Sequence, residues 1–278
     1  MGTSASSSGP GSGVPLVPPW VDDPPETTPT GDSEQAEPNA DQDPATPNRA
    51  PELAPAGRFR GTRLNLGRFG SSGSGESLRR GLGHYVRSGL GGSTRAAQRF
   101  GGTARKSGSV VGVLQALRSG APTPIDLGID PARLAGRPAL ETADRIAQAV
   151  SPPDGTQDSE ASREALTVAL RELIAKEPNV DLTALTEQQI ELVMEAFIAE
   201  DICRRIELDV GKAIFDKAPS AAAAGSRFKQ MNRYVRQHVA ASLRRLRDSS
   251  KSLAVNTARK LASRAIRDTL QVFEEYVS

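Results

Sequence analysis

The sequence is poor in the residues that build disulfides, metal sites and aromatic cores. Its 278 residues include one cysteine, Cys203, and two histidines, and aromatic residues make up 4%. A single cysteine excludes an intramolecular disulfide, which is typical of a protein from a reducing compartment. No CxxC, HxxxH or HExxH motif occurs, so the sequence offers no recognisable set of metal ligands.

Long apolar runs are also missing. A membrane-spanning helix needs about 18 or more consecutive apolar residues, and neither such a run nor a basic-then-apolar leader is present. We therefore expect a cytoplasmic protein with no membrane segment. The opening residues, Met1 to Ser6, do match the short myristoylation pattern M-G-x-x-x-[ST]. A lipid-anchored peripheral protein is thus an alternative, and it requires a eukaryotic source.

The chain has little net charge, but its positive and negative residues are separated along the sequence. The net charge of +2 conceals four blocks: −8 over residues 1–57, +11 over 58–120, −9 over 121–219 and +8 over 220–278. Blocks of opposite sign can satisfy one another within a fold or an assembly. The basic blocks are therefore not by themselves evidence of nucleic-acid binding.

Residues 1–57 predict a disordered tail. They hold twelve of the chain's 20 prolines together with many glycines, serines and acids, and such a composition buries too little apolar surface to fold. An apolar island, Val14–Val21, interrupts the tail and contains the only tryptophan, Trp20. A solvated tail has no hydrophobic core in which to bury a tryptophan. One interpretation is therefore that another protein binds Trp20. An incidental aromatic residue is the other.

Residues 58–120 combine more than half of the 26 glycines with eleven arginines. Apolar spacing predicts helices over 76–88 and 93–117, a basic strand or coil over 58–63, and a hinge over 70–75. Glycine inside a helix costs up to about 1 kcal/mol. These helices must therefore pack closely against another backbone, or become ordered only in a complex.

Residues 121–278 predict a helical bundle. Helices are expected over 130–135, 138–150, 159–176, 186–214, 220–246 and 258–277. The fourth begins with a capping box at Thr186 and Gln189 and carries two apolar columns, so we expect it to be deeply buried and kinked near Gly211. The whole chain is predicted to be all-α, with a tail (1–57), a Gly/Arg-rich segment (58–120) and a bundle (121–278).

Catalytic candidates are weak. His84 and His238 are far apart in sequence, and each fits a boundary between core and solvent better than a catalytic role. Residues 101–107 resemble a phosphate-binding loop, but Arg105 stands where the motif needs its second glycine. We expect the acids of the long helix to lie on its solvated face: Glu195, Glu200, Asp201, Glu207 and Asp209.

The basic segments support an alternative function, a helical module that binds nucleic acid. The candidate phosphate-contacting residues are Arg58, Arg60, Arg63, Arg79 and Arg80. Two further clusters lie near the C-terminus, one with Arg227, Lys229, Arg233 and Arg236, the other with Arg244, Arg245 and Arg247. Aromatic residues are nearly absent around them, so pairing with the acidic blocks is the favoured interpretation.

Several short motifs resemble the B component of the bacterial Qat anti-phage defence systems. They are Met1-Gly2-Thr3-Ser4, Pro15-Leu16-Val17-Pro18-Pro19-Trp20, Arg58-Phe59-Arg60-Gly61, Leu82-Gly83-His84-Tyr85-Val86-Arg87, Gly91-Gly92-Ser93 and Arg99-Phe100-Gly101-Gly102. They are spread discontinuously over the first 120 residues, in the same order as in that family. The resemblance implies a non-enzymatic protein without a cofactor, encoded with an ATPase, an enzyme similar to the QueC synthases and a TatD-like nuclease.

The resemblance also implies a modification. The QueC-like member attaches a deazaguanine to the exposed N-terminal glycine, which in this sequence is Gly2 after loss of Met1. A free amine on a Gly/Ser-rich arm can reach into an active site. The extended proline-rich motif, made of Pro15, Leu16, Val17, Pro18, Pro19 and Trp20, is then expected to bind the partner at low ordering cost.

Overall fold

The computed structural model describes residues 13–17, 53–121, 129–130, 134, 136–247 and 253–277. Over these residues the fold is all-α, which confirms the predicted class. The one β pairing among them is an isolated antiparallel bridge between Pro15 and Leu53. No described helix is both long and apolar enough to cross a bilayer.

The described helices fall into two groups along the chain. Before residue 121 they are α1 (Arg60–Ser72), α2 (Gly75–His84), the π-helix η1 (Tyr85–Gly89), α3 (Ser93–Arg99) and α4 (Gly101–Ser119). After it they are α6 (Ala139–Val150), α7 (Gln157–Lys176), α8 (Glu187–Val210), α9 (Lys212–Phe215), α10 (Ala221–Arg247) and α11 (Val255–Glu275).

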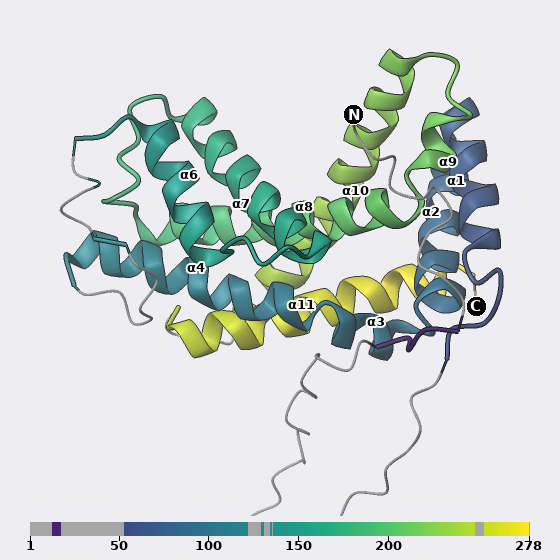
Figure 1. Ribbon diagram of the computed structural model, residues 1–278, viewed down its shortest axis with the longest axis horizontal. Helices are drawn as coiled ribbons and strands as arrows, with labels where there is room; N and C mark the ends of the chain where they lie inside the picture. The colour runs from purple at the N-terminus through teal and green to yellow at the C-terminus, as the bar shows by residue number, and fades with distance from the viewer. Residues whose placement is uncertain are drawn as a thin grey trace, which may run out of the picture.

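Helix α8 lies at the centre of the molecule. It packs against α7, α10 and α4, while α4 and α11 lie side by side along one edge (Figure 1). Helices α6 and α7 lie on one side of α8, and α1, α9 and α10 on the other (Figure 1). One apolar cluster runs through the molecule from Phe59 to Phe273, and helices from both ends of the chain contribute to it.

The local sequence explains how α8 begins and ends. The Thr186 side chain accepts a hydrogen bond from the Gln189 N–H at 3.2 Å, and the Gln189 side chain accepts one from the Thr186 N–H at 2.8 Å. This is the predicted capping box. At the other end, Gly211 separates α8 from the single turn of α9, so the helix is interrupted at the residue where a kink was predicted.

The glycine-rich helices pack closely against other backbones, which was one of the two predicted outcomes. A Cβ added to Gly70 in α1 would lie 2.6 Å from the carbonyl oxygen of Ile214. One added to Gly83 in α2 would lie 2.9 Å from the carbonyl oxygen of Phe273. Such distances are shorter than van der Waals contact, so only glycine lets α1 approach α9 and lets α2 approach α11 this closely.

Some local predictions need correction. The strand or coil expected over 58–63 is wrong, because α1 begins at Arg60 and packs against α2 and α9. The hinge expected over 70–75 is a tight turn in which Gly73 adopts a φ of 74° and Ser74 caps α2. The helix expected over 93–117 is divided at Phe100 into α3 and α4.

Other predictions fall partly outside the described residues. The residues of the tail before 13 and between 17 and 53 are not among them, and neither are 131–133 and 135 of the short helix expected over 130–135. Residues 13–17 of the tail, by contrast, have a defined position on the helical body.

Replacing Gly70 by alanine tests the close approach of α1 and α9. We expect Gly70→Ala to lower the free energy of unfolding by about 1–3 kcal/mol, because the added methyl group collides with backbone atoms that cannot rotate away. Gly102→Ala in α4 is the matched control. A Cβ there meets nothing within 4 Å, so this change should be neutral or stabilise by up to about 1 kcal/mol.

Urea denaturation of the two variants and of the unaltered chain measures both effects. Equal stability of Gly70→Ala and Gly102→Ala would contradict the close approach.

Candidate functional site

The N-terminal segment is attached to the helical body by a short backbone clip. The Gly13 N–H donates a hydrogen bond to the Ala54 carbonyl oxygen at 2.9 Å, and the Ala54 N–H donates one to the Val14 carbonyl oxygen at 2.8 Å. Pro15 pairs with Leu53 in the same antiparallel arrangement. We use the name clip for residues 13–17 together with Leu53 and Ala54.

Leu16 provides the apolar contact of the clip. Its side chain is 4% exposed, whereas that of Val14, two residues earlier, is 42% exposed. The space for Leu16 exists because Gly91 has no side chain: a Cβ at Gly91 would lie 2.9 Å from the Leu16 Cδ1 atom, and its φ of 78° also favours glycine. Burial of a leucine side chain contributes about 1.5–3 kcal/mol.

The backbone next to Leu16 contains a π turn. The Leu90 N–H donates to the Tyr85 carbonyl oxygen at 3.0 Å, five residues back, and the Gly92 N–H donates to the Val86 carbonyl oxygen at 3.0 Å. The Ser93 N–H then donates to the Glu274 side chain at 2.9 Å, which joins the start of α3 to the end of α11. Single π turns inside helical segments are frequent at functional sites.

Beneath the π turn lies a buried carboxylate. The Tyr85 hydroxyl donates to Asp209 Oδ2 at 2.8 Å, and the Arg99 guanidinium lies 3.6 Å from Oδ1 of the same residue. Burial raises the pKa of Asp209, although Arg99 acts against this rise. Burial and the neighbouring Asp209 charge both raise the pKa of Tyr85, so the phenol is held in its protonated, donating form.

A second carboxylate, Asp201, is buried two turns earlier in α8. It is 0% exposed, and it accepts hydrogen bonds from Ser162 Oγ at 2.8 Å, from the Thr103 hydroxyl and from Arg205 Nε at 3.1 Å. Arg205 also lies 2.6 Å from Asp158. Burial alone would lower the pKa of Arg205, but the two carboxylates outweigh it and raise that pKa above its ordinary value.

The prediction that the acids of α8 lie on a solvated face is therefore wrong for Asp201 and Asp209. Residues of α3, α4 and α7 contact the side of α8 that carries Asp201 and Asp209. The two apolar columns of the sequence did not predict that this side is covered. The missed signal was the spacing of Asp201, Arg205 and Asp209 at intervals of four, with alternating charge. Such a column faces one side of a helix and can satisfy its own charges when buried.

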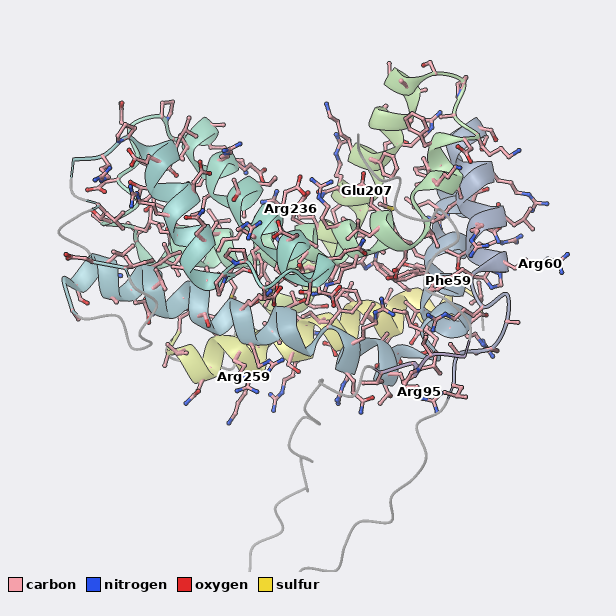
Figure 2. The ribbon with its side chains drawn as sticks, in the orientation of Figure 1. Phe59, Arg60, Arg95, Glu207, Arg236 and Arg259 are labelled. Carbon is pink, nitrogen blue, oxygen red and sulfur yellow. The ribbon has the colours of Figure 1, made fainter. Side chains whose placement is uncertain are left out.

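The five arginines predicted to contact phosphates occupy different environments. Arg58 is 6% exposed, its guanidinium forms no hydrogen bond with another described residue, and it lies over the Phe59 ring at 4.9 Å. The Arg58 guanidinium is therefore not accessible to a phosphate at the surface, which corrects the expectation that Arg58 contacts phosphate. Arg60 points outward from α1 (Figure 2), Arg63 is half-buried, and Arg79 and Arg80 are exposed on α2. Arg80 pairs with Glu76 at 2.8 Å.

The partner-binding motif of the sequence is also divided. Leu16 is buried in the clip, and Pro15 and Val17 are half-buried. Pro18, Pro19 and Trp20 lie outside the described residues, as does Gly2. While the clip is formed, Leu16 binds this chain and not a partner.

Charge pairing within the chain is confirmed for part of the C-terminal basic block. Arg236 pairs with Glu172 and lies 3.8 Å from Glu195. Arg247 lies 3.1 Å from Glu187 and 2.5 Å from Glu191. These pairs join α10 to the acidic helices α7 and α8, as the alternating charge blocks predicted.

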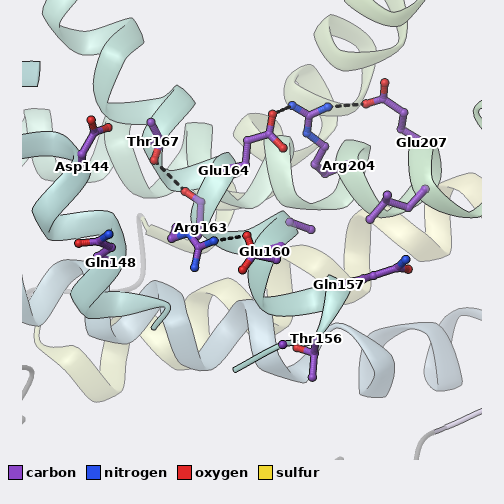
Figure 3. A pocket seen from close by; sticks show the side chains of 13 residues that line it. Asp144, Gln148, Thr156, Gln157, Glu160, Arg163, Glu164, Thr167, Arg204 and Glu207 are labelled. Atoms are coloured by element: carbon purple, nitrogen blue, oxygen red, sulfur yellow. Dashed lines mark hydrogen bonds and ion pairs between the residues drawn. The ribbon is translucent and has the colours of Figure 1, made fainter. Parts of the chain in front are cut away.

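An open groove of about 750 Å³ lies between α6, α7 and α8 (Figure 3). Arg204 of α8 pairs with Glu164 of α7, while Arg204 also pairs with Glu207 at 3.0 Å within α8 and Arg163 pairs with Glu160 within α7. No motif or spacing in the sequence predicts this groove. Its charged side chains are largely matched to one another, and the described residues contain no cluster of three metal-ligating side chains.

A comparison with protein families identifies the chain. The family described as Qat anti-phage system associated protein QatB matches residues 91–273. The chain belongs to the QatB family. It is therefore a component of Qat anti-phage defence, and other components of that system are its partners. No curated protein and no solved structure matches the chain.

Removing the charge of Asp201 tests the buried column. We expect Asp201→Asn to lower the free energy of unfolding by about 3 kcal/mol, because the buried Arg205 loses the buried carboxylate of Asp201 and keeps only Asp158, which is about half exposed. Glu76→Gln is the control, since it breaks the exposed ion pair with Arg80 and should cost less than about 1 kcal/mol.

Urea denaturation at neutral pH gives both values. A loss for Asp201→Asn no larger than that for Glu76→Gln would show that the buried column does not support the fold.

Proposed function

We propose that this QatB family member is a non-enzymatic adaptor in cytoplasmic Qat defence and that its N-terminus is a protein substrate. Gly2, exposed by removal of Met1, receives a deazaguanine from a QueC-like enzyme. The ATPase and the TatD-like nuclease of the same system are the further partners of the helical body. The resemblance of the opening motifs to the family supplies the chemistry of this proposal.

The observation that best supports the proposal is the clip. Two backbone hydrogen bonds and the buried Leu16 attach residues 13–17 to the body, so the segment that carries Gly2 is joined to the body at one defined point. A substrate amine must enter an active site, and an arm that starts at a defined point can deliver it there while the body stays outside. A free chain end carried by a folded body suits this task.

The intact mass of the chain tests the modification. Produced together with the QueC-like enzyme and nucleotide, it should carry a deazaguanine on its N-terminal peptide. Gly2→Glu should abolish the adduct, because a large second residue prevents removal of Met1 and leaves no glycine amine. Ser8→Glu is the matched control, since it adds the same charge to the arm and keeps Gly2. An unmodified N-terminal peptide in the unaltered chain contradicts the proposal.

A second candidate function, nucleic-acid binding, is favoured by one face of α11. Its exposed cations lie on one side of the helix, and none of them forms an ion pair with another described residue: Arg259, Lys260, Arg264 and Arg267. Figure 2 shows Arg259 pointing away from the body. Clustered cations without partners are what phosphate binding requires.

Reversing charge on this face tests the second candidate. If the α11 face binds phosphates, Arg259→Glu/Arg267→Glu should weaken binding of a fluorescent DNA or RNA duplex and reduce the dependence of affinity on salt by about two charges. The control, Arg171→Glu/Lys176→Glu, reverses two exposed cations of α7 that pair with Asp144 and Glu172. Fluorescence anisotropy at low salt measures both. Absence of binding by the unaltered chain removes this candidate.

A further inference from the structure

We infer that the cationic face of α11 binds the groove between α6, α7 and α8 on a second copy of this chain. The cationic face consists of Arg259, Lys260, Arg264 and Arg267. The inference goes beyond the proposed function and does not depend on modification of Gly2. It assigns a protein partner to a face that is also a candidate for nucleic-acid binding, and the two occupants predict different results.

The last two charge blocks of the sequence neutralise each other only in part. The described pairs between them involve α10, as Arg236 with Glu172 and Arg247 with Glu187 show. The cationic face takes no part in this pairing, since none of its four side chains forms an ion pair or hydrogen bond with another described residue. Positive charge without a partner in one copy can find one on a second copy.

The cationic face is a continuous row. Its positions recur at helical spacing, and the row from Arg259 to Arg267 is about 12 Å long, since each residue adds about 1.5 Å. No acid lies between Val255 and Arg267 in the sequence. The next acid, Asp268, is paired with Arg245 at 2.7 Å. Arg259 points away from the body (Figure 2), so the row faces outward.

The groove carries the opposite charge. Four carboxylates line it against two guanidiniums: Asp144, Glu160, Glu164 and Glu207 against Arg163 and Arg204. Arg204 is shared between two of these acids, so one guanidinium serves two carboxylates (Figure 3).

Asp154, next to the lining residue Gly155, adds a further negative charge at the rim. Hydrogen bonds from Ser159 and Thr156 lower the pKa of Asp154 to about 2, so it is ionised at neutral pH. Arg171, which pairs with Asp144, is the one cation outside the lining that offsets this surplus. The groove and its rim therefore keep more carboxylates than cations.

The acids of the groove are accessible to an incoming helix. The side chains of Glu160 and Glu164 are 51% and 56% exposed. Exposed ion pairs contribute at most about 1 kcal/mol, so these carboxylates can exchange their present partners for the cations of α11. Leu208 also lines the groove and is 41% exposed, which gives the methylene groups of an arginine side chain an apolar surface to pack against.

The two surfaces belong to different sides of the molecule. Helix α11 packs against α3, α4 and α10, whereas α7 packs against α6 and α8 (Figure 1). The cationic face of one copy therefore meets the groove of the next copy. Because each contact uses two different surfaces, every bound pair still has one free face and one free groove, and the assembly can continue.

Sedimentation velocity tests the association, with the chain first freed of nucleic acid by nuclease and high salt. The average mass should rise with protein concentration at about 0.1 M salt and fall to that of the monomer at about 1 M, where the Debye length is about 3 Å. Arg259→Gln/Arg267→Gln and Glu160→Gln/Glu164→Gln should each weaken association at least about tenfold. Arg79→Gln/Arg80→Gln, the matched control, removes two exposed cations of α2 and should associate like the unaltered chain.

Mixing the two weakened variants gives the decisive result. The first keeps its groove and the second keeps its cationic face, so together they should form a pair with one copy of each and nothing larger. Neutral glutamines ensure that the two altered surfaces do not attract each other. Circular dichroism should show the same helix content in every variant, because all the altered side chains are exposed.

Three results would overturn the inference. One is an unaltered chain that stays monomeric at low salt, and another is a mixture of the two variants that stays monomeric. The third is a chain that associates equally well with Arg259→Gln/Arg267→Gln but loses its binding to a DNA duplex, which would assign the cationic face to nucleic acid.

Discussion

The burial of α8 on nearly all sides is the constraint on which the rest of the structure depends. A helix at the centre of a bundle cannot send its polar side chains to water, so Asp201, Arg205 and Asp209 must find their partners inside the protein. Those partners come from two separate parts of the chain. Ser162 and Asp158 belong to the start of α7, whereas Tyr85 and Arg99 belong to the glycine-rich part.

The glycines and the buried charges therefore act together. A hydroxyl or a guanidinium can satisfy a buried carboxylate only when its helix comes within hydrogen-bond distance, and bulky side chains at the helix contacts would hold the backbones apart. Gly70 and Gly83 remove that obstacle for α1 and α2. The Gly/Arg-rich segment, residues 58–120, has the composition least suited to folding alone. It is held in place by its contacts with the buried side chains of α8.

Much of the fold follows from local sequence signals. The apolar columns of α8, its capping box at Thr186 and the break at Gly211 all depend on residues near one another in the chain, and these predictions were confirmed. The division of the helix at Phe100 and the burial of Asp201 could not be predicted in the same way. Both depend on which helix lies opposite, and no local pattern in one sequence carries that information.

The candidate site shows the same limit. The apolar island around Leu16 predicts a segment that binds something, but the sequence pattern does not indicate that the contact lies in the same chain. The structure shows that Leu16 contacts Gly91, some 75 positions later in the chain. A glycine with a positive φ could be suspected from the Gly91-Gly92 pair, but the side chain that uses the resulting space could not.

The π turn of η1 has a consequence for how this family can vary. A π turn contains one residue more than the α turn it replaces, so it behaves as a single-residue insertion in a helix. Loss of one residue between Tyr85 and Gly89 would rotate everything before it by about 100° around the helix axis relative to α3. That rotation would carry Gly83 away from α11 and Phe59 away from Gly89. The length of this five-residue segment is therefore under tighter constraint than its composition.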